Sequence, residues 1–281
     1  MRKLCALVVL LTLVAGMSAV AGETVCRGQV KTVAEGFRFT EGPAWHPDGF
    51  IVFSDIPANT IYRLTEDGQK KVYRRPSGNS NGLVFDAQGR LVACEHGNRR
   101  VSVTRDDEPE TLVDSYNGKR LNSPNDLVIR SDGSIYFTDP PYGVDEAARE
   151  LDFQGLYRIG PDGEELNLLA KDFVRPNGIV LSPDEETLYV ADTQKSWVRA
   201  FDVEEDGSIS NGRVFAEADD LHPDGMAMDV EGNLYVTGGG GVWVFAPDGE
   251  RLEIIETDRR PANVTFGGPE RRTLYVTARS D

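Results

Sequence analysis

Six short segments of the chain begin with a residue that carries a side-chain oxygen and continue into an apolar, strand-like run. The six starting residues are Glu41, Asn81, Asn125, Asn177, Asp224 and Asn263. Carboxylate and amide oxygens are the ligands that hard cations such as Ca²⁺ prefer, whereas softer metals require Cys or His. Glu41 and Asp224 together supply two negative charges, which match one divalent ion. If the fold gathers these residues, they predict a cation site, from which Asn263 is left out because neither Gly nor Asp follows it.

A local interpretation competes with this one. An Asn-Gly pair such as Asn177-Gly178 is typical of a tight turn between two strands, and Asn side chains often hydrogen-bond to nearby backbone at strand starts. For a single pair the turn is the simpler interpretation. The recurrence of an oxygen-bearing residue at every equivalent position favours a shared site.

The recurrence also predicts the fold. The six starting residues are 40, 44, 52, 47 and 39 positions apart. Each is followed by an apolar strand, a turn rich in Asp, Gly and Pro, and a second apolar strand, and residues 60–73, 155–169 and 241–255 add a third and a fourth strand. This pattern predicts an all-β, six-bladed β-propeller with four-stranded antiparallel blades. In a propeller the innermost strands surround one channel, so the six starting residues should form a ring.

The two ends of the chain should close the propeller. The last repeat contains two clear strands before Asp281, and a strand within residues 30–36 is expected to join that blade. This blade would still be one strand short, through either a truncated C-terminus or a reduced blade.

Residues 1–21 have the features of a secretory signal peptide. Arg2 and Lys3 precede an apolar run over residues 4–14, and Ala19-Val20-Ala21 has the small-x-small form of a cleavage site. The mature propeller would then span residues 22–281, without a membrane span, in the periplasm or outside the cell. Its cysteines, Cys26 and Cys94, could pair in such a compartment.

The net charge excludes one class of partner. The chain carries −16 at pH 7, and removing residues 1–21 takes away two basic and no acidic residues, which makes it −18. So acidic a protein repels phosphate backbones, and we expect no nucleic-acid partner. The oligomeric state stays open.

The chain resembles the SMP-30/gluconolactonase/LRE-like family. The motifs that carry the resemblance are "EGPAW" at Glu41, "SPNDLV" at Ser123, "RPNGIVLSPDEETLYVADT" at Arg175 and "PDGMAMDVEGNLYVTG" at Pro223, while "CEHGNRRV" at Cys94 resembles the bacterial gluconolactonase branch. The resemblance implies a six-bladed propeller with one divalent cation held by Glu41, Asn177 and Asp224. It implies that Asn125 is a further metal ligand or a substrate contact. Ca²⁺ is the expected ion, with Zn²⁺, Mg²⁺ and Mn²⁺ as alternatives.

These observations lead to a functional hypothesis. The protein would open a small-molecule sugar lactone to its acid, with Asp224 as metal ligand and general base. Asn81, Asn125, His96 and Tyr142 are the candidate substrate contacts. The alternatives are a phosphotriester hydrolase using the same site and a secreted binding scaffold with a structural ion. A Ser-His-Asp hydrolase is disfavoured because there is no Gly-x-Ser-x-Gly motif.

Overall fold

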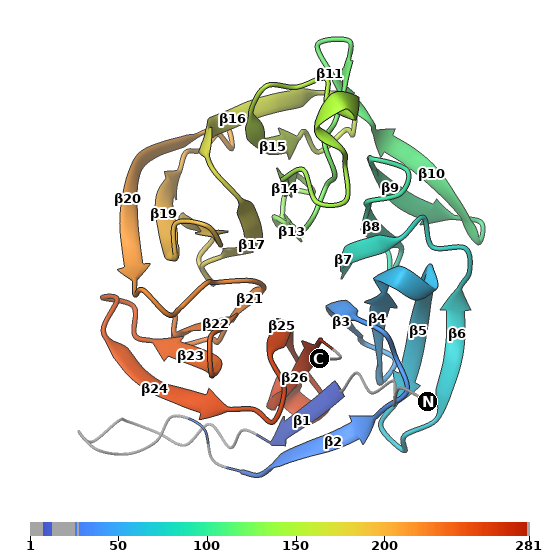
Figure 1. Ribbon diagram of the computed structural model, residues 1–281, viewed down its shortest axis with the longest axis vertical. Coiled ribbons are helices and arrows are strands. Elements are labelled where there is room, and N and C mark those ends of the chain that lie inside the picture. Colours follow the sequence, from blue (N-terminus) through green and yellow to red (C-terminus); the bar gives the residue numbers. More distant parts are fainter. Residues whose placement is uncertain (1–7, 13–25, 27, 280–281) are drawn as a thin grey trace.

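The computed structural model describes residues 8–12, 26 and 28–279, which form antiparallel sheets arranged around a central axis (Figure 1). Five of the sheets are built from four consecutive strands. The first blade comprises β3 (Thr40–His46), β4 (Phe50–Asp55), β5 (Thr60–Thr65) and β6 (Lys70–Arg74). The second comprises β7 (Ser80–Phe85), β8 (Leu91–Glu95), β9 (Arg100–Arg105) and β10 (Glu108–Val113).

The next three blades repeat this order. The third comprises β13 (Leu127–Ile129), β14 (Ile135–Asp139), β15 (Gln154–Ile159) and β16 (Leu166–Phe173). The fourth comprises β17 (Pro176–Leu181), β18 (Thr187–Asp192), β19 (Trp197–Val203) and β20 (Ile209–Glu217). The fifth comprises β21 (Met226–Met228), β22 (Leu234–Gly238), β23 (Gly241–Phe245) and β24 (Arg251–Glu256). The predicted all-β propeller with four-stranded antiparallel blades is therefore confirmed.

A closing sheet joins the two ends of the chain. It contains β25 (Pro261–Gly267), β26 (Thr273–Ala278), β1 (Val8–Thr12) and β2 (Val30–Ala34), in the order β2-β1-β26-β25. The expected strand near residue 30 is thus present as β2. The missing strand is supplied by β1, which pairs with β26 on one side and β2 on the other. Because β1 lies inside the segment predicted to be a signal peptide, cleavage after Ala21 would remove this strand. The cleavage itself stays a prediction, and most of residues 1–21 lie outside the described residues.

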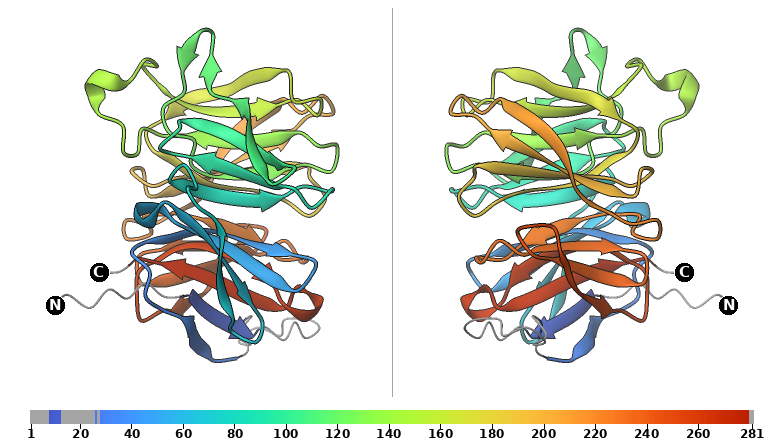
Figure 2. Two further views of the ribbon diagram at one scale, coloured as in Figure 1. Left: turned by 90° about the vertical axis from the view of Figure 1, so that its right-hand side faces the viewer. Right: turned by 90° about the vertical axis from the view of Figure 1, so that its left-hand side faces the viewer.

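Short elements complete the described chain. A hairpin of β11 (Ser115–Tyr116) and β12 (Lys119–Arg120) and a loop with the 3₁₀ turn η2 (Glu146–Ala148) extend beyond the blades, as Figure 2 shows. The turns η1 (Ile56–Ala58) and η3 (Pro269–Arg271) connect strands. Within the described residues, the structure has no helix whose length and hydropathy would suit a membrane span.

The core lies between neighbouring sheets. Successive side chains of a strand point to opposite faces of its sheet, and the third blade shows the consequence. Phe137 and Tyr157 pack toward the second blade, whereas Tyr136 and Leu156 pack toward the fourth. Among the described residues, a buried apolar cluster fills every interface between adjacent sheets, including both faces of the closing sheet. This packing fixes the inner strands around the axis.

Cys26 and Cys94 do not form the disulfide that the sequence left open. Cys94 is buried between the second and third blades, whereas Cys26 packs against the cluster between the fifth blade and the closing sheet. The two thiols therefore belong to different interfaces and are both free.

Candidate active site

The inner strands meet at the starting residues that the sequence analysis selected. Asn81 and Asn177 are the second residues of β7 and β17, and both are buried. The Gly that follows each contacts the next blade: the Gly82 N–H donates to the Asn125 carbonyl at 2.8 Å, and the Gly178 N–H donates to the Asp224 carbonyl at 3.0 Å.

This contact explains the recurrent Asn-Gly pairs. Neither Gly82 nor Gly178 has a positive φ, so neither forms a turn that only glycine could adopt. A Cβ added at Gly178 would lie 2.2 Å from the Asp224 carbonyl oxygen, and one at Gly82 would lie 2.7 Å from the Asn125 carbonyl oxygen. Glycine is required because adjacent blades approach too closely for a side chain. The interpretation of Asn177-Gly178 as a turn was wrong.

Three Asn side chains from consecutive blades form a hydrogen-bonded chain. Nδ2 of Asn81 donates to Oδ1 of Asn125 at 2.6 Å, and Nδ2 of Asn125 donates to Oδ1 of Asn177 at 2.5 Å. Nδ2 of Asn177 then donates to Oγ1 of Thr193 at 2.9 Å. At the head of this chain Oδ1 of Asn81 is buried and has no hydrogen-bond partner. An unpaired buried acceptor is costly, so this oxygen is available to a ligand.

Buried carboxylates lie beside the amide chain. Glu41 and Asp224 are 3% and 5% exposed. Burial, followed by the charges of Asp224 and Asp126, raises the pKa of Glu41 well above its usual range. Burial also raises the pKa of Asp224, although Arg279, whose Nη2 donates to Asp224 Oδ2 at 3.0 Å, acts in the opposite direction. Glu41 and Asp224 are therefore close enough for the negative charge of Asp224 to oppose ionisation of Glu41.

Asp126 and Arg279 were missed by the sequence analysis. Asp126 follows Asn125 and takes the place that Gly82 and Gly178 occupy in their own blades, and this substitution within the repeat was the available signal. Its Oδ2 accepts a hydrogen bond from Nδ2 of Asn263 at 3.2 Å, which joins the third blade to the closing sheet. Burial raises the pKa of Asp126 to about 7. Nothing local in the sequence marked Arg279.

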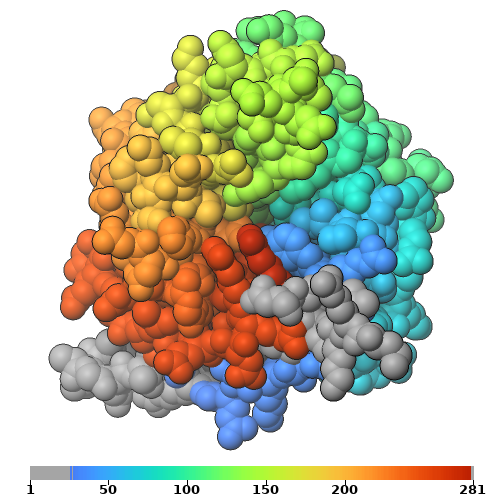
Figure 3. Space-filling view, in the orientation of Figure 1, coloured from blue at the N-terminus to red at the C-terminus, as the bar shows by residue number. Residues whose placement is uncertain are grey.

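His96 and Tyr142, two predicted substrate contacts, flank the amide chain. Nε2 of His96 lies 3.3 Å from Nδ2 of Asn81 and 3.2 Å from Oδ1 of Asn125. The rings of His96 and Tyr142 stack at 6.5 Å, and the Tyr142 hydroxyl accepts a hydrogen bond from Nδ2 of Asn177 at 3.3 Å. Burial lowers the pKa of His96 to about 4, so its imidazole is neutral at neutral pH. The face of the molecule seen in Figure 3 is hollowed near the axis, where the colours of segments distant in the sequence meet.

The remaining histidines lie elsewhere. Nδ1 of His46 accepts the Asp48 N–H at 3.1 Å in the turn after β3, and its ring packs on Phe50. His222 shares a 2.9 Å hydrogen bond with Ser196 in the loops before β19 and β21. Within the described structure, neither histidine has a hydrogen bond to the Asn side chains of the amide chain.

The donor set suits a hard cation. Among the described residues, no three or more His, Cys, Asp and Glu side chains are grouped in a way that could hold a metal. The set is instead two carboxylates, Glu41 and Asp224, with neighbouring amide oxygens. Oxygen-only donors of this kind are typical of Ca²⁺ sites. The unpaired Oδ1 of Asn81 and the mutual repulsion of the carboxylates are both conditions that a cation would relieve.

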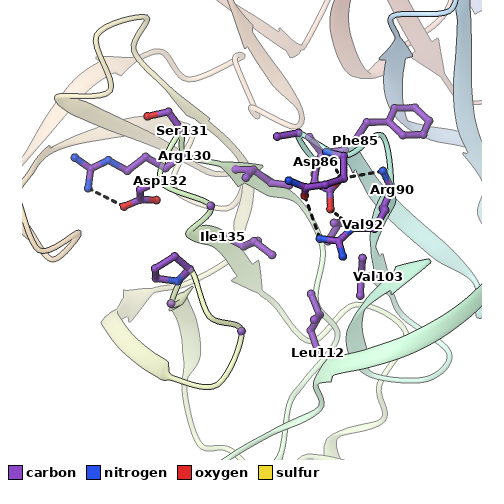
Figure 4. Close-up of a pocket in the computed structure, with 18 of the residues that line it drawn as sticks. Phe85, Asp86, Arg90, Val92, Val103, Leu112, Arg130, Ser131, Asp132 and Ile135 are labelled. Carbon is purple, nitrogen blue, oxygen red and sulfur yellow. Dashed lines mark hydrogen bonds and ion pairs between the residues drawn. The ribbon is translucent and has the colours of Figure 1, made fainter. Parts of the chain in front are cut away.

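A separate cavity of about 520 Å³ lies between the second and third blades (Figure 4). It is lined by the turns at residues 86–90 and 130–133, at the ends of β7 and β13 remote from the amide chain. Two of its arginines are already paired, with Arg90 Nε 2.6 Å from Asp86 Oδ2 and Arg130 Nη1 3.4 Å from Asp132 Oδ2. Among the described residues that line it, no buried side-chain polar atom lacks a hydrogen-bond partner, in contrast to Oδ1 of Asn81.

The fold agrees with the comparisons to known proteins. Residues 39–280 match the model of the SMP-30/Gluconolactonase/LRE-like region, and the chain belongs to this family. It is 35% identical to a gluconolactonase of Zymomonas mobilis over 89% of this chain and 78% of the relative. It is also 35% identical to a 6-deoxy-6-sulfogluconolactonase of Pseudomonas putida over 85% of this chain and 82% of the relative. A solved gluconolactonase from Xanthomonas campestris is similar with a TM-score of 0.79 and 37% identity, covering 86% of each chain.

Proposed function

We propose that this protein hydrolyses a sugar lactone to the corresponding aldonic acid, in a propeller whose closing sheet is its sixth blade. The observation that carries the proposal is the position of Asp224, a buried carboxylate whose backbone carbonyl accepts the N–H of Gly178, beside Asn177 of the amide chain, and whose charge acts on Glu41. The gluconolactonase and sulfogluconolactonase relatives support a sugar lactone as the substrate.

A divalent cation fits this site. Glu41, Asn177 and Asp224 would hold it, with Asn125 as a further ligand or a substrate contact, and we propose Ca²⁺ because all the donors are oxygens. When bound, such an ion polarises a carbonyl and lowers the pKa of water.

The protein's own groups account for the proton transfers. The Asp224 carboxylate takes a proton from water as the water oxygen bonds to the lactone carbonyl carbon. The same proton returns to the ring oxygen as the C–O bond of the lactone breaks. Burial raises the pKa of Asp224 toward the working range of a base, while the 3.0 Å contact with Arg279 orients it.

Other side chains bind and orient the sugar. Asn81 and Asn125 each use one Nδ2 hydrogen for the neighbouring amide, and the second hydrogen would donate to the carbonyl oxygen as it gains charge. His96, neutral at neutral pH, and Tyr142 form one wall of the site and supply hydrogen bonds to sugar hydroxyls without adding charge.

The test combines turnover with metal binding. Purified protein should open D-glucono-1,5-lactone, lose this activity in a chelator and recover it with Ca²⁺, and Ca²⁺ alone should raise the melting temperature. Asp224→Asn should remain folded and lose at least about 100-fold in kcat. Asp202→Asn, at an exposed ion pair with Arg213, is the matched control. A folded protein that binds the ion but opens no lactone would favour a scaffold, and phosphotriester turnover without lactone turnover would favour the other hydrolase.

We also propose that the protein acts outside the cytoplasm. The N-terminal pattern of basic, apolar and small residues supports this location. Fractionation of cells that express the full chain, followed by N-terminal sequencing of the product, tests it. A product that keeps residues 1–21 in the cytoplasm would refute it.

A further inference from the structure

Arg279 has an N–H donor without a hydrogen-bond partner among the described residues. Its Nη2 binds Asp224, and its guanidinium lies 4.9 Å from the centre of the Phe39 ring. Nε of Arg279 is buried without a hydrogen-bond partner, while the side chain as a whole is 39% exposed. One edge of the guanidinium is therefore held at the carboxylate and the remaining N–H groups are free to meet a ligand.

Two further arginines lie around the same opening. The Arg279 N–H donates to the Arg260 carbonyl at 3.1 Å, which places Arg260 next to it, and the Arg260 charge reaches Asp224. Arg175 lies over the Tyr142 ring at 5.3 Å, and Tyr142 feels the charges of both Arg175 and Arg279. Within the described part of the chain, Arg175 and Arg260 make no ion pair.

This arrangement is unusual for so acidic a protein. The net charge is −16, yet three arginines lie near Asp224 and Tyr142. The carboxylates that face them are Glu41, Asp126 and Asp224, and all three are buried. Of the arginines, Arg279 alone is paired with one of these carboxylates. The rim of the site is thus positive, with guanidinium groups that suit planar or tetrahedral oxyanions.

We infer that the substrate is an anionic sugar lactone, with a carboxylate or other oxyanion at the end of the sugar remote from the lactone carbonyl. Arg279 binds the anion through its free N–H groups, and Arg175 and Arg260 attract and orient it. The inference rests on the proposed lactone hydrolysis and adds the charge of the substrate. A neutral lactone would leave the unpaired Nε of Arg279 without a partner.

A matched pair of substrates tests the inference. D-glucono-1,4-lactone and D-glucaro-1,4-lactone differ only at C6, which is an alcohol in the first and a carboxylate in the second. We expect kcat/KM to be at least about tenfold higher for the glucarolactone, because one charge-assisted hydrogen bond stabilises binding by about that factor. This preference should shrink as salt is raised, because screening weakens the attraction.

Variants separate recognition from catalysis. Arg175→Gln and Arg260→Gln should each reduce the preference for the glucarolactone several-fold, because each should lower kcat/KM for the glucarolactone more than for the gluconolactone. Arg213→Gln, in an exposed ion pair on the outer strand β20, should change kcat/KM for neither lactone. Equal or better turnover of the neutral lactone, with no effect of Arg175→Gln, would overturn the inference while the proposed function stands.

A binding measurement keeps the two proposals distinguishable. If neither lactone is opened, the proposed hydrolysis fails. Neither lactone is then consumed, so calorimetry with D-glucaro-1,4-lactone and D-glucono-1,4-lactone compares the effect of the charge at C6 alone. Tighter binding of the glucarolactone, weakened in Arg279→Gln, supports the anion site, whereas equal binding of the two lactones refutes it.

Discussion

Replacing Gly178 with alanine tests whether the close approach of adjacent blades positions the site. A Cβ at this position would lie 2.2 Å from the carbonyl oxygen of Asp224, whereas ordinary contacts of this kind begin near 3.4 Å. The fourth and fifth blades must therefore separate locally by about 1 Å. The Gly178 N–H bond to the same oxygen, at 3.0 Å, would be stretched or broken.

The cost can be worked from these two effects. Overpacking of a tight interface costs about 1–3 kcal/mol, and loss of one hydrogen bond adds about 1 kcal/mol. For a protein of this size each kcal/mol lowers the melting temperature by about 2–4 °C, so Gly178→Ala should melt about 5–15 °C below the wild type. Because Asp224 moves with its carbonyl, lactone turnover should fall by about 100-fold.

The assay needs thermal unfolding and turnover measured on the same preparations. Gly118→Ala is the control: its backbone has φ +75°, in the hairpin β11–β12, and no atom lies within 4 Å of the added Cβ. This variant should lose only about 1 kcal/mol, the cost of a side chain in the left-handed region, and keep full turnover. A Gly178→Ala protein that has the melting temperature and the activity of the wild type would show that the contact between the blades does not position the site.

Three further outcomes are expected. Glu95 is buried and paired with Arg74 Nη2 at 3.0 Å and Arg100 Nε at 2.7 Å. Glu95→Gln should therefore lower the free energy of unfolding by about 3 kcal/mol, measured by urea titration at pH 7. A loss under about 1 kcal/mol would refute this. Burial opposes ionisation of Glu95, but hydrogen bonds from Arg100, Ser102 and Asn98 and the charge of Arg74 hold its pKa below 4.5. The stability that the ionised Glu95 contributes is therefore complete above pH 4.5. It is lost as the pH falls through the lower pKa of the folded state. Wild type should therefore lose more stability than Glu95→Gln across this acidic window, and parallel pH profiles would contradict the assignment. A chain that begins at Gly22 lacks β1 and should melt at a lower temperature than the full chain, and equal melting temperatures would show that β1 does not stabilise the closing sheet.

Much of the architecture could be predicted from the sequence because a propeller is a repeated local pattern. An oxygen-bearing residue, an apolar strand, a turn and a second strand recur at each blade, and each step is encoded within about fifteen neighbouring residues. The same repeat selected Asn81, Asn125 and Asn177, which the structure connects in one hydrogen-bonded chain. Their roles as metal ligands and substrate contacts stay predictions, whereas their proximity is a feature of the structure.

Other features depend on contacts between distant parts of the chain. Asp126 meets Asn263 across 137 residues and Arg279 meets Asp224 across 55, and no local pattern specifies either pair. The sequence analysis offered a turn as the only local explanation of Gly178, because a close approach to another blade leaves no sign in neighbouring residues. The sequence also left open which strand pairs with β26 on its outer side. The apolar pattern of a strand indicates that it will join a sheet, but it does not indicate which segment lies next to it.

The sequence by itself determined the repeat, the type of blade and the oxygen-bearing residues at the inner strand ends. Only the tertiary structure decided which of these residues touch, which carboxylates are buried together and where the arginines of the opening lie. The physical reason is that strand and turn formation depend on nearby residues, whereas closing a ring brings together groups whose separation along the chain carries no information about their separation in space.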